Sequence, residues 1–182
     1  MHNIALNGGV QMQKKRQGSW SRQGRTRLIL LAALLLTGLV LMLKSRAGTE
    51  QLQFPLDTDR WRVSDSYGWR ADPYTEEQTF HCGIDFSCAE GTAVLAADDG
   101  MVEETTSGGS YGNCIRLFHD GSRKTLYAHL QYVYDRPGET VARGQVLGTA
   151  GQTGRATGPH LHFELWRQGI ACDPAAALGL DV

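Results

Sequence analysis

Apolar residues occur along most of this chain in short runs separated by Gly, Asp-Gly or Pro-Gly turns. The runs are rich in Val, Ile, Leu, Phe and Tyr, which favour strands, and helical periodicity is weak. We therefore predict an all-β domain, a mainly antiparallel sheet folded over a single core, with a short closing helix after Asp173-Pro174. The strand-like runs are Thr92–Ala96, Gly100–Glu104, Cys114–His119, Thr125–Leu130 and Gln145–Thr149.

One apolar run breaks this pattern. Residues 28–43, LILLAALLLTGLVLML, are apolar almost throughout, whereas a helix on a soluble core has separate polar and apolar faces. The run is shorter than the ~20 residues that usually span a bilayer, but Lys44 and the preceding arginine can extend to the interfaces. We interpret residues 28–43 as one N-terminal transmembrane helix.

The distribution of charge predicts how this helix is oriented in the membrane. The chain has a formal net charge of −1, but every acidic residue lies after residue 48, whereas residues 1–27 contain only basic charges. The basic side of a membrane helix stays in the cytoplasm, so we expect a single-pass protein of the cell membrane with its remaining part outside the cytoplasm. A basic tail beside an apolar span favours contact with anionic lipid, and we predict no nucleic-acid partner.

A cleaved signal peptide is the alternative for the same segment. Its apolar core would be unusually long, and Ser45-Arg46-Ala47 is a poor cleavage site because a bulky cation occupies its centre. We therefore predict four regions: a basic cytoplasmic tail (1–27), a transmembrane helix or uncleaved signal anchor (28–43), a polar stalk (44–59) and one domain (60–182).

Histidines suggest the chemistry of that domain. His160 and His162 lie two residues apart in TGPHLHFEL, so a strand directs both side chains to one face. His81 and Asp85 in FHCGIDF are also an even number of residues apart, and His129 lies in a further strand-like run, LYAHL. Two imidazoles and one carboxylate form a catalytic type of zinc site with one position open, although these ligand types also suit iron.

These motifs together resemble the lysostaphin-type (LytM-like) peptidoglycan endopeptidases. The resemblance extends from about Ser64 to Pro174 and includes His81-x-x-x-Asp85, Tyr127-Ala-His129-Leu130 and Gly158-Pro-His-Leu-His162 in the family's order. It implies a compact antiparallel β-sandwich of the lysostaphin type, with a groove across one sheet and a zinc ion at its floor. It also implies a zinc metalloendopeptidase that hydrolyses stem or cross-bridge peptides of peptidoglycan.

The resemblance also assigns roles. It implies one Zn²⁺ bound by His81, Asp85 and His162, with His129 and His160 as the catalytic pair. One histidine would accept a proton from water and pass it to the leaving amine, and the other would stabilise the oxyanion. We favour His129 as the base, although sequence does not decide between the two.

Two other classes of function are open to a chain of this kind. A non-catalytic family member that binds the wall or activates another hydrolase would lack some of the five residues, but all five are present. A lipoyl-type carrier or a sugar-phosphotransferase domain would share only a hairpin such as Val141–Leu147, and its tip has no modifiable lysine. Any regulatory protein partner is unspecified by the sequence.

The remaining polar residues allow structural interpretations. We expect His119 on the surface, Asn113 in a turn, and Tyr127 in packing or chemistry. Asp72 stands where the family commonly has a histidine, and Glu164 is either a partner of a histidine or a solvated strand end. The four cysteines permit two disulfides or buried thiols, with no pairing indicated: Cys82, Cys88, Cys114 and Cys172.

Overall fold

The computed structural model describes Leu31 and residues 51–181. The predicted cytoplasmic tail (1–27), nearly all of the predicted transmembrane helix (28–43) and the first part of the predicted stalk (44–50) lie outside the described residues. Within the described residues, no helix combines the length and the apolar composition that crossing a bilayer requires.

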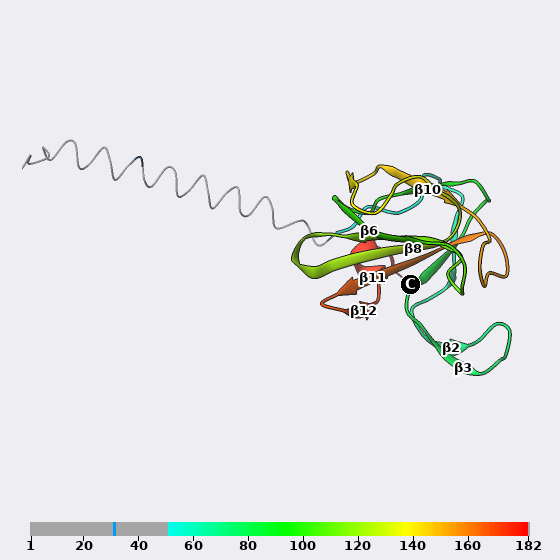
Figure 1. The fold of residues 1–182 in the computed structure, drawn as a ribbon. Helices are drawn as coiled ribbons and strands as arrows, with labels where there is room; N and C mark the ends of the chain where they lie inside the picture. Colours follow the sequence, from blue (N-terminus) through cyan, green and yellow to red (C-terminus); the bar gives the residue numbers. More distant parts are fainter. Residues whose placement is uncertain (1–30, 32–50, 182) are drawn as a thin grey trace, which may run out of the picture. The chain divides into compact units, whose positions relative to one another are not determined.

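The described domain is mostly antiparallel β-structure, as predicted (Figure 1). All five strands expected from apolar runs are present, with bounds that differ by a few residues, and the short C-terminal helix follows Pro174. The elements are β1 (Arg62–Asp65), β2 (Gly68–Ala71), β3 (Gln78–His81), β4 (Ile84–Ser87), β5 (Ala93–Leu95), β6 (Gly100–Thr106), β7 (Asn113–Phe118), the 3₁₀ turn η1 (Asp120–Ser122), β8 (Arg123–Val133), β9 (Thr140–Val141), β10 (Val146–Ala150), β11 (His160–Arg167), β12 (Ile170–Cys172) and α2 (Ala175–Leu178).

The longest strand, β8, connects the parts of the main sheet. Strands follow the order β1-β4-β11-β8-β7-β6-β9, and β8 pairs in addition with β10 through its last residues, Leu130 to Val133. The register of β8 shifts against both β7 and β10 near residue 130, so the strand is irregular there. Such irregularities bend a strand and redirect its side chains. This one lies beside His129.

Side-chain alternation separates the core from the site. Leu161, Phe163 and Leu165 of β11 are at most 1% exposed and pack in the core, and Ile84 and Phe86 of β4 join them. The alternate residues of β11 and β4 therefore face the other side of the sheet. His162 pairs directly with Asp85 in this register.

A two-stranded hairpin, β2–β3, projects from the main sheet (Figure 1). His81 ends β3, Cys82 and Gly83 interrupt the strand, and Asp85 lies in β4. Strand alternation therefore does not continue across the break, and Cys82 does not share the buried side of Ile84 and Phe86. Cys82 is half-buried and lines the groove described below.

The domain begins earlier than predicted. Residues 51–59 of the expected stalk are part of it: Leu52 and Leu56 are 3% and 4% exposed and pack in the main core. Backbone bonds fix this segment, with the amide of Leu52 donating to the Ala177 carbonyl and the amide of Leu95 donating to that of Pro55. The boundary predicted at residue 60 is therefore too late.

Three smaller expectations are also resolved. His119 is 2% exposed, so the prediction of a surface position is wrong. Tyr127 is fully buried, and its hydroxyl accepts a hydrogen bond from the Ala97 amide, which is a packing role. All four cysteines are free thiols.

Candidate metal centre and active site

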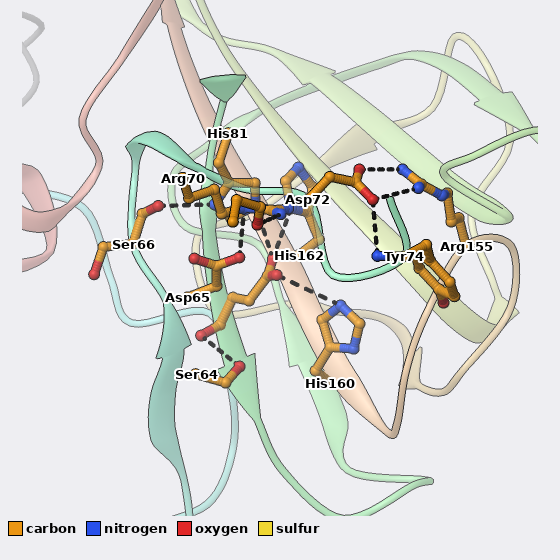
Figure 2. A network of polar contacts seen from close by, with 12 residues as sticks. Ser64, Asp65, Ser66, Arg70, Asp72, Tyr74, His81, Arg155, His160 and His162 are labelled. Atoms are coloured by element: carbon orange, nitrogen blue, oxygen red, sulfur yellow. Dashed lines mark hydrogen bonds and ion pairs between the residues drawn. The ribbon is translucent and has the colours of Figure 1, made fainter. Parts of the chain in front are cut away.

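Three of the predicted site residues, His81, Asp85 and His162, meet at one point. Figure 2 labels the two histidines. His81 Nε2 lies 3.0 Å from His162 Nδ1, and Asp85 Oδ1 lies 3.2 Å from the first atom and 2.7 Å from the second. Strand β3 supplies His81, β4 supplies Asp85 and β11 supplies His162. A tetrahedral zinc site with bonds of 2.0–2.1 Å separates its ligand atoms by about 3.3 Å, so the spacing of this set fits such an ion.

Hydrogen bonds fix which ring nitrogens face this point. His81 Nδ1 donates to the carbonyl of Ser66 at 2.9 Å, because a carbonyl only accepts, and its Nε2 is left with a lone pair. His162 Nε2 donates to Glu164 Oε1 at 3.0 Å, which directs the Nδ1 of His162 to the same point. When both rings are neutral, two lone pairs and a carboxylate converge, an arrangement that repels itself unless a proton or a metal cation lies between them.

The pKa values of Asp85 and His162 agree with this electrostatic picture. Burial acts to raise the pKa of Asp85, but hydrogen bonds from His162 and His81 outweigh it and hold the pKa well below its ordinary value. Burial acts to lower the pKa of His162, yet its bonds to Asp85 and Glu164 prevail and raise the pKa to about 9. The centre therefore attracts a proton or a metal cation, and the donor set fits a divalent metal.

Glu164 accepts a hydrogen bond from Nε2 of His162, the ring nitrogen that faces away from the metal ligands. Its side chain is fully buried, so the interpretation of a solvated strand end is excluded. Besides the His162 bond, Oε1 accepts the Tyr111 hydroxyl at 2.7 Å, and Oε2 accepts Trp166 Nε1 at 2.6 Å. Burial acts to raise the pKa of Glu164, but these bonds, led by that of His162, lower it overall. Glu164 is thus an ionised acceptor that fixes the orientation of His162.

His129 and His160 form a second pair beside the metal centre. Their ring centroids are 4.6 Å apart, and both side chains line the same groove. His129 has a φ of 61°, which is rare for a non-glycine residue, at the irregular point of β8. This backbone turn directs the imidazole into the groove, and a conformation of this kind is often found at functional sites.

Backbone carbonyls hold both rings of this pair. His129 Nδ1 donates to the Thr153 carbonyl at 2.8 Å, and His160 Nδ1 donates to the Gly158 carbonyl at 2.7 Å. Each ring therefore has Nε2 free for chemistry. Burial lowers the pKa of His129 to about 4, so its Nε2 carries a lone pair at neutral pH.

The five residues lie in one groove with a volume of about 540 Å³. The walls come from β1, the β2–β3 hairpin and the segment between β10 and β11, and they include Arg62, Arg70, Tyr74, Phe80 and Arg155. The structure thus brings together every predicted site residue. It also adds Tyr111, Trp166 and the carbonyls of Thr153 and Gly158, none of which has a sequence signal beyond its proximity to a motif.

Comparison with known proteins gives the family. Residues 79–174, more than half of the chain and all five site residues, match Peptidase family M23. This chain belongs to that family. The resemblance found in the sequence motifs is confirmed.

Several individual proteins resemble this M23 chain in sequence or in structure. Peptidoglycan DD-endopeptidase ShyA of Vibrio cholerae is 39% identical over 114 residues, which are 62% of this chain and 26% of that protein. A zinc-containing peptidase from Vibrio cholerae has a TM-score of 0.64 and 32% identity, covering 72% of this chain and 40% of that one. The catalytic domain of lysostaphin from Staphylococcus simulans has a TM-score of 0.60 and 29% identity, covering 66% and 94%. The M23 chain spans about a quarter of the length of the curated relatives that it matches.

Proposed function

We propose that this M23 chain is a zinc endopeptidase that hydrolyses peptide cross-links of peptidoglycan. The observation that carries the proposal is the convergence of His81 Nε2, His162 Nδ1 and an ionised Asp85 carboxylate on one point. These three residues are the proposed metal ligands. The similarity to a zinc-containing peptidase supports zinc over iron, and the relatives named DD-endopeptidases support a D,D cross-link as the bond.

His129 is the proposed general base. Bound zinc would polarise the scissile carbonyl and lower the pKa of the attacking water. His129 Nε2 accepts the proton of that water, because burial keeps the ring neutral and Thr153 holds the Nδ1 proton. The same nitrogen then returns the proton to the leaving amine, an effect of about 10²–10⁴-fold.

His160 is the proposed stabiliser of the oxyanion. Its Nδ1–H is donated to Gly158, and Nε2 lies on the groove side, 3.8 Å from Asp85 Oδ2. In its imidazolium form, which keeps the Nδ1–H bond to Gly158, His160 donates a hydrogen bond from Nε2 to the carbonyl oxygen as negative charge develops there.

The proposal is tested by mass spectrometry of the fragments that the purified full-length chain releases from cell-wall sacculi. We expect cross-linked dimers to become monomers, with loss of the reaction in chelator and recovery with added Zn²⁺. His162→Ala should lose both zinc and turnover, whereas His129→Ala should retain zinc and lose turnover. Normal digestion by both variants contradicts the proposed site, and release of cleaved glycan strands with intact cross-links contradicts the proposed bond.

A further inference from the structure

One segment holds both histidines of the proposed catalytic pair. Residues 151–159 connect β10 to β11 and contain the two carbonyl acceptors, Thr153 for His129 and Gly158 for His160. A shift of this segment would break the hydrogen bonds that Nδ1 of each ring donates to these carbonyls. It would also change which nitrogen of each ring faces the groove.

The first half of this segment is well anchored. Thr153 Oγ1 donates to the Leu130 carbonyl at 2.8 Å and accepts from the Asn113 amide at 2.9 Å. Gly154 packs so tightly that a Cβ placed on it would lie 2.3 Å from the Gly112 nitrogen. The second half differs, because the loop backbone hydrogen bonds found among residues 51–181 include none to residues 156–159.

Arg155 lies at the junction of the two halves and has an unusual partner. Its Nη1 and Nη2 donate to Asp72 Oδ2 and Oδ1 at 2.7 and 2.6 Å, a bidentate pair that joins the segment to the loop of the β2–β3 hairpin (Figure 2). Its guanidinium also stacks on Tyr74, with Cζ 4.5 Å from the ring centroid. Bidentate pairing restrains orientation as well as distance.

The hairpin end of the pair is rigid too. Asp72 is 7% exposed, and its Oδ1 accepts the amides of Tyr74 and Thr75 at 2.8 and 3.0 Å. The hydrogen bonds from Arg155, followed by that from Tyr74, hold the pKa of Asp72 well below its ordinary value, so the pair stays ionised. The Asp72 carboxylate thus stabilises the turn that follows it and at the same time holds the Arg155 guanidinium.

We propose that the Asp72–Arg155 ion pair positions His129 and His160, by holding the segment whose carbonyls fix both rings. The proposal rests on the proposed function for its kinetic consequence. The pair contributes no atom to the metal centre, whose side chains lie on β3, β4 and β11. Through this pair, the β2–β3 hairpin, which forms one wall of the groove, helps to position the two histidines. Asp72 and Arg155 are therefore positioning residues. Pairing with Arg155 gives a structural reason for an aspartate at position 72, where the family commonly has a histidine.

The test uses the full-length chain and variants that remove one property at a time. Asp72→Asn retains the oxygen that accepts the Tyr74 and Thr75 amides but loses the charge. Arg155→Met removes the pair, and Arg155→Lys restores the charge without the bidentate geometry. Lys124→Met breaks an ion pair with Glu103, 2.5 Å long and outside the groove, and is the control for the loss of a surface ion pair.

We expect kcat on cross-linked peptide to fall about 10- to 100-fold in Asp72→Asn and Arg155→Met, since small displacements of reacting groups have effects of this size. KM and zinc stoichiometry should stay within about twofold of the wild type, Arg155→Lys should recover part of kcat, and Lys124→Met should match the wild type. ¹⁵N-detected spectra of the histidine rings should show a protonated Nδ1 on both His129 and His160 in the wild type and a partly deprotonated Nδ1 in Arg155→Met.

Two results would overturn the inference. A rise in KM at unchanged kcat would make Arg155 a substrate contact, and unchanged ring spectra in both Arg155 variants would show that the pair does not hold the histidines. The ring spectra are independent of turnover. A wild-type chain without zinc-dependent cleavage would therefore disprove the proposed function while the spectra still decide the positioning.

Discussion

At the scale of single residues, the burial of Glu164 has a measurable consequence. A neutral amide at this position accepts a weaker hydrogen bond from His162 and orients it less firmly. We expect Glu164→Gln to weaken zinc binding about 10- to 100-fold, as is typical when a residue behind a metal ligand is changed. Competition against a chromophoric chelator measures this directly. Glu104→Gln, which alters an exposed pair with Arg116, is the control and should retain wild-type affinity. Equal affinities in the two variants would show that Glu164 has no part in metal binding.

The same scale shows what could be predicted from the sequence. His160 and His162 could be placed on one face because strand alternation is a local rule that the register of β11 obeys. His119 could not be placed, because its burial depends on partners from two other parts of the chain: Nδ1 donates to the Asp99 carbonyl, and Nε2 accepts from the Thr125 hydroxyl. The supports of His129 and His160 are backbone carbonyls, and any residue type supplies a carbonyl.

At the scale of elements, side-chain alternation predicted correctly which residues share a face within one strand, but it did not hold across the break between two strands. His81 and Asp85 meet as predicted, but they do so from β3 and β4 across a break, not from one strand. Gly83 permits this break, because a Cβ there would lie 2.4 Å from the Phe163 carbonyl oxygen. The sequence signal for the break was a single glycine. The burial of Leu52 and Leu56 had no periodic pattern to predict it.

The junction of β7 and β8 contains a buried neutral histidine, which makes stability depend on pH. Burial is the main cause that lowers the pKa of His119. Below about pH 6.5 the unfolded chain takes up a proton at this residue and the folded chain does not, so the free energy of unfolding decreases as the pH falls. One such group contributes at most about 1.4 kcal/mol per pH unit. We expect the melting temperature of His119→Gln, at fixed zinc concentration, to fall less between pH 7 and pH 5 than that of the wild type. Parallel slopes for the two proteins would contradict this assignment.

At the scale of the whole molecule, the chain combines the groove of the proposed peptidase with an N-terminal segment that is first basic and then apolar. The proposed substrate lies outside the cytoplasm, so the groove must be exported to reach it. Residues 1–27 contain six basic residues and no acidic ones, and residues 28–43 are apolar almost throughout. Both features favour a helix that crosses the membrane with its basic end inside.

We propose that residues 28–43 remain attached and anchor the domain on the outer side of the cytoplasmic membrane. Leu35→Arg with Leu36→Arg places two charges mid-run, at a cost of about 2.5–3.5 kcal/mol each for insertion. We expect this variant to leave the carbonate-resistant membrane fraction, whereas Leu35→Ala with Leu36→Ala should stay in it. Intact mass spectrometry of the extracted wild type distinguishes the anchor from a cleaved signal, because the two differ by the whole basic tail and apolar run. A mature chain that begins after residue 43 would refute the anchor, yet it would leave the groove on the same side of the membrane as its proposed substrate.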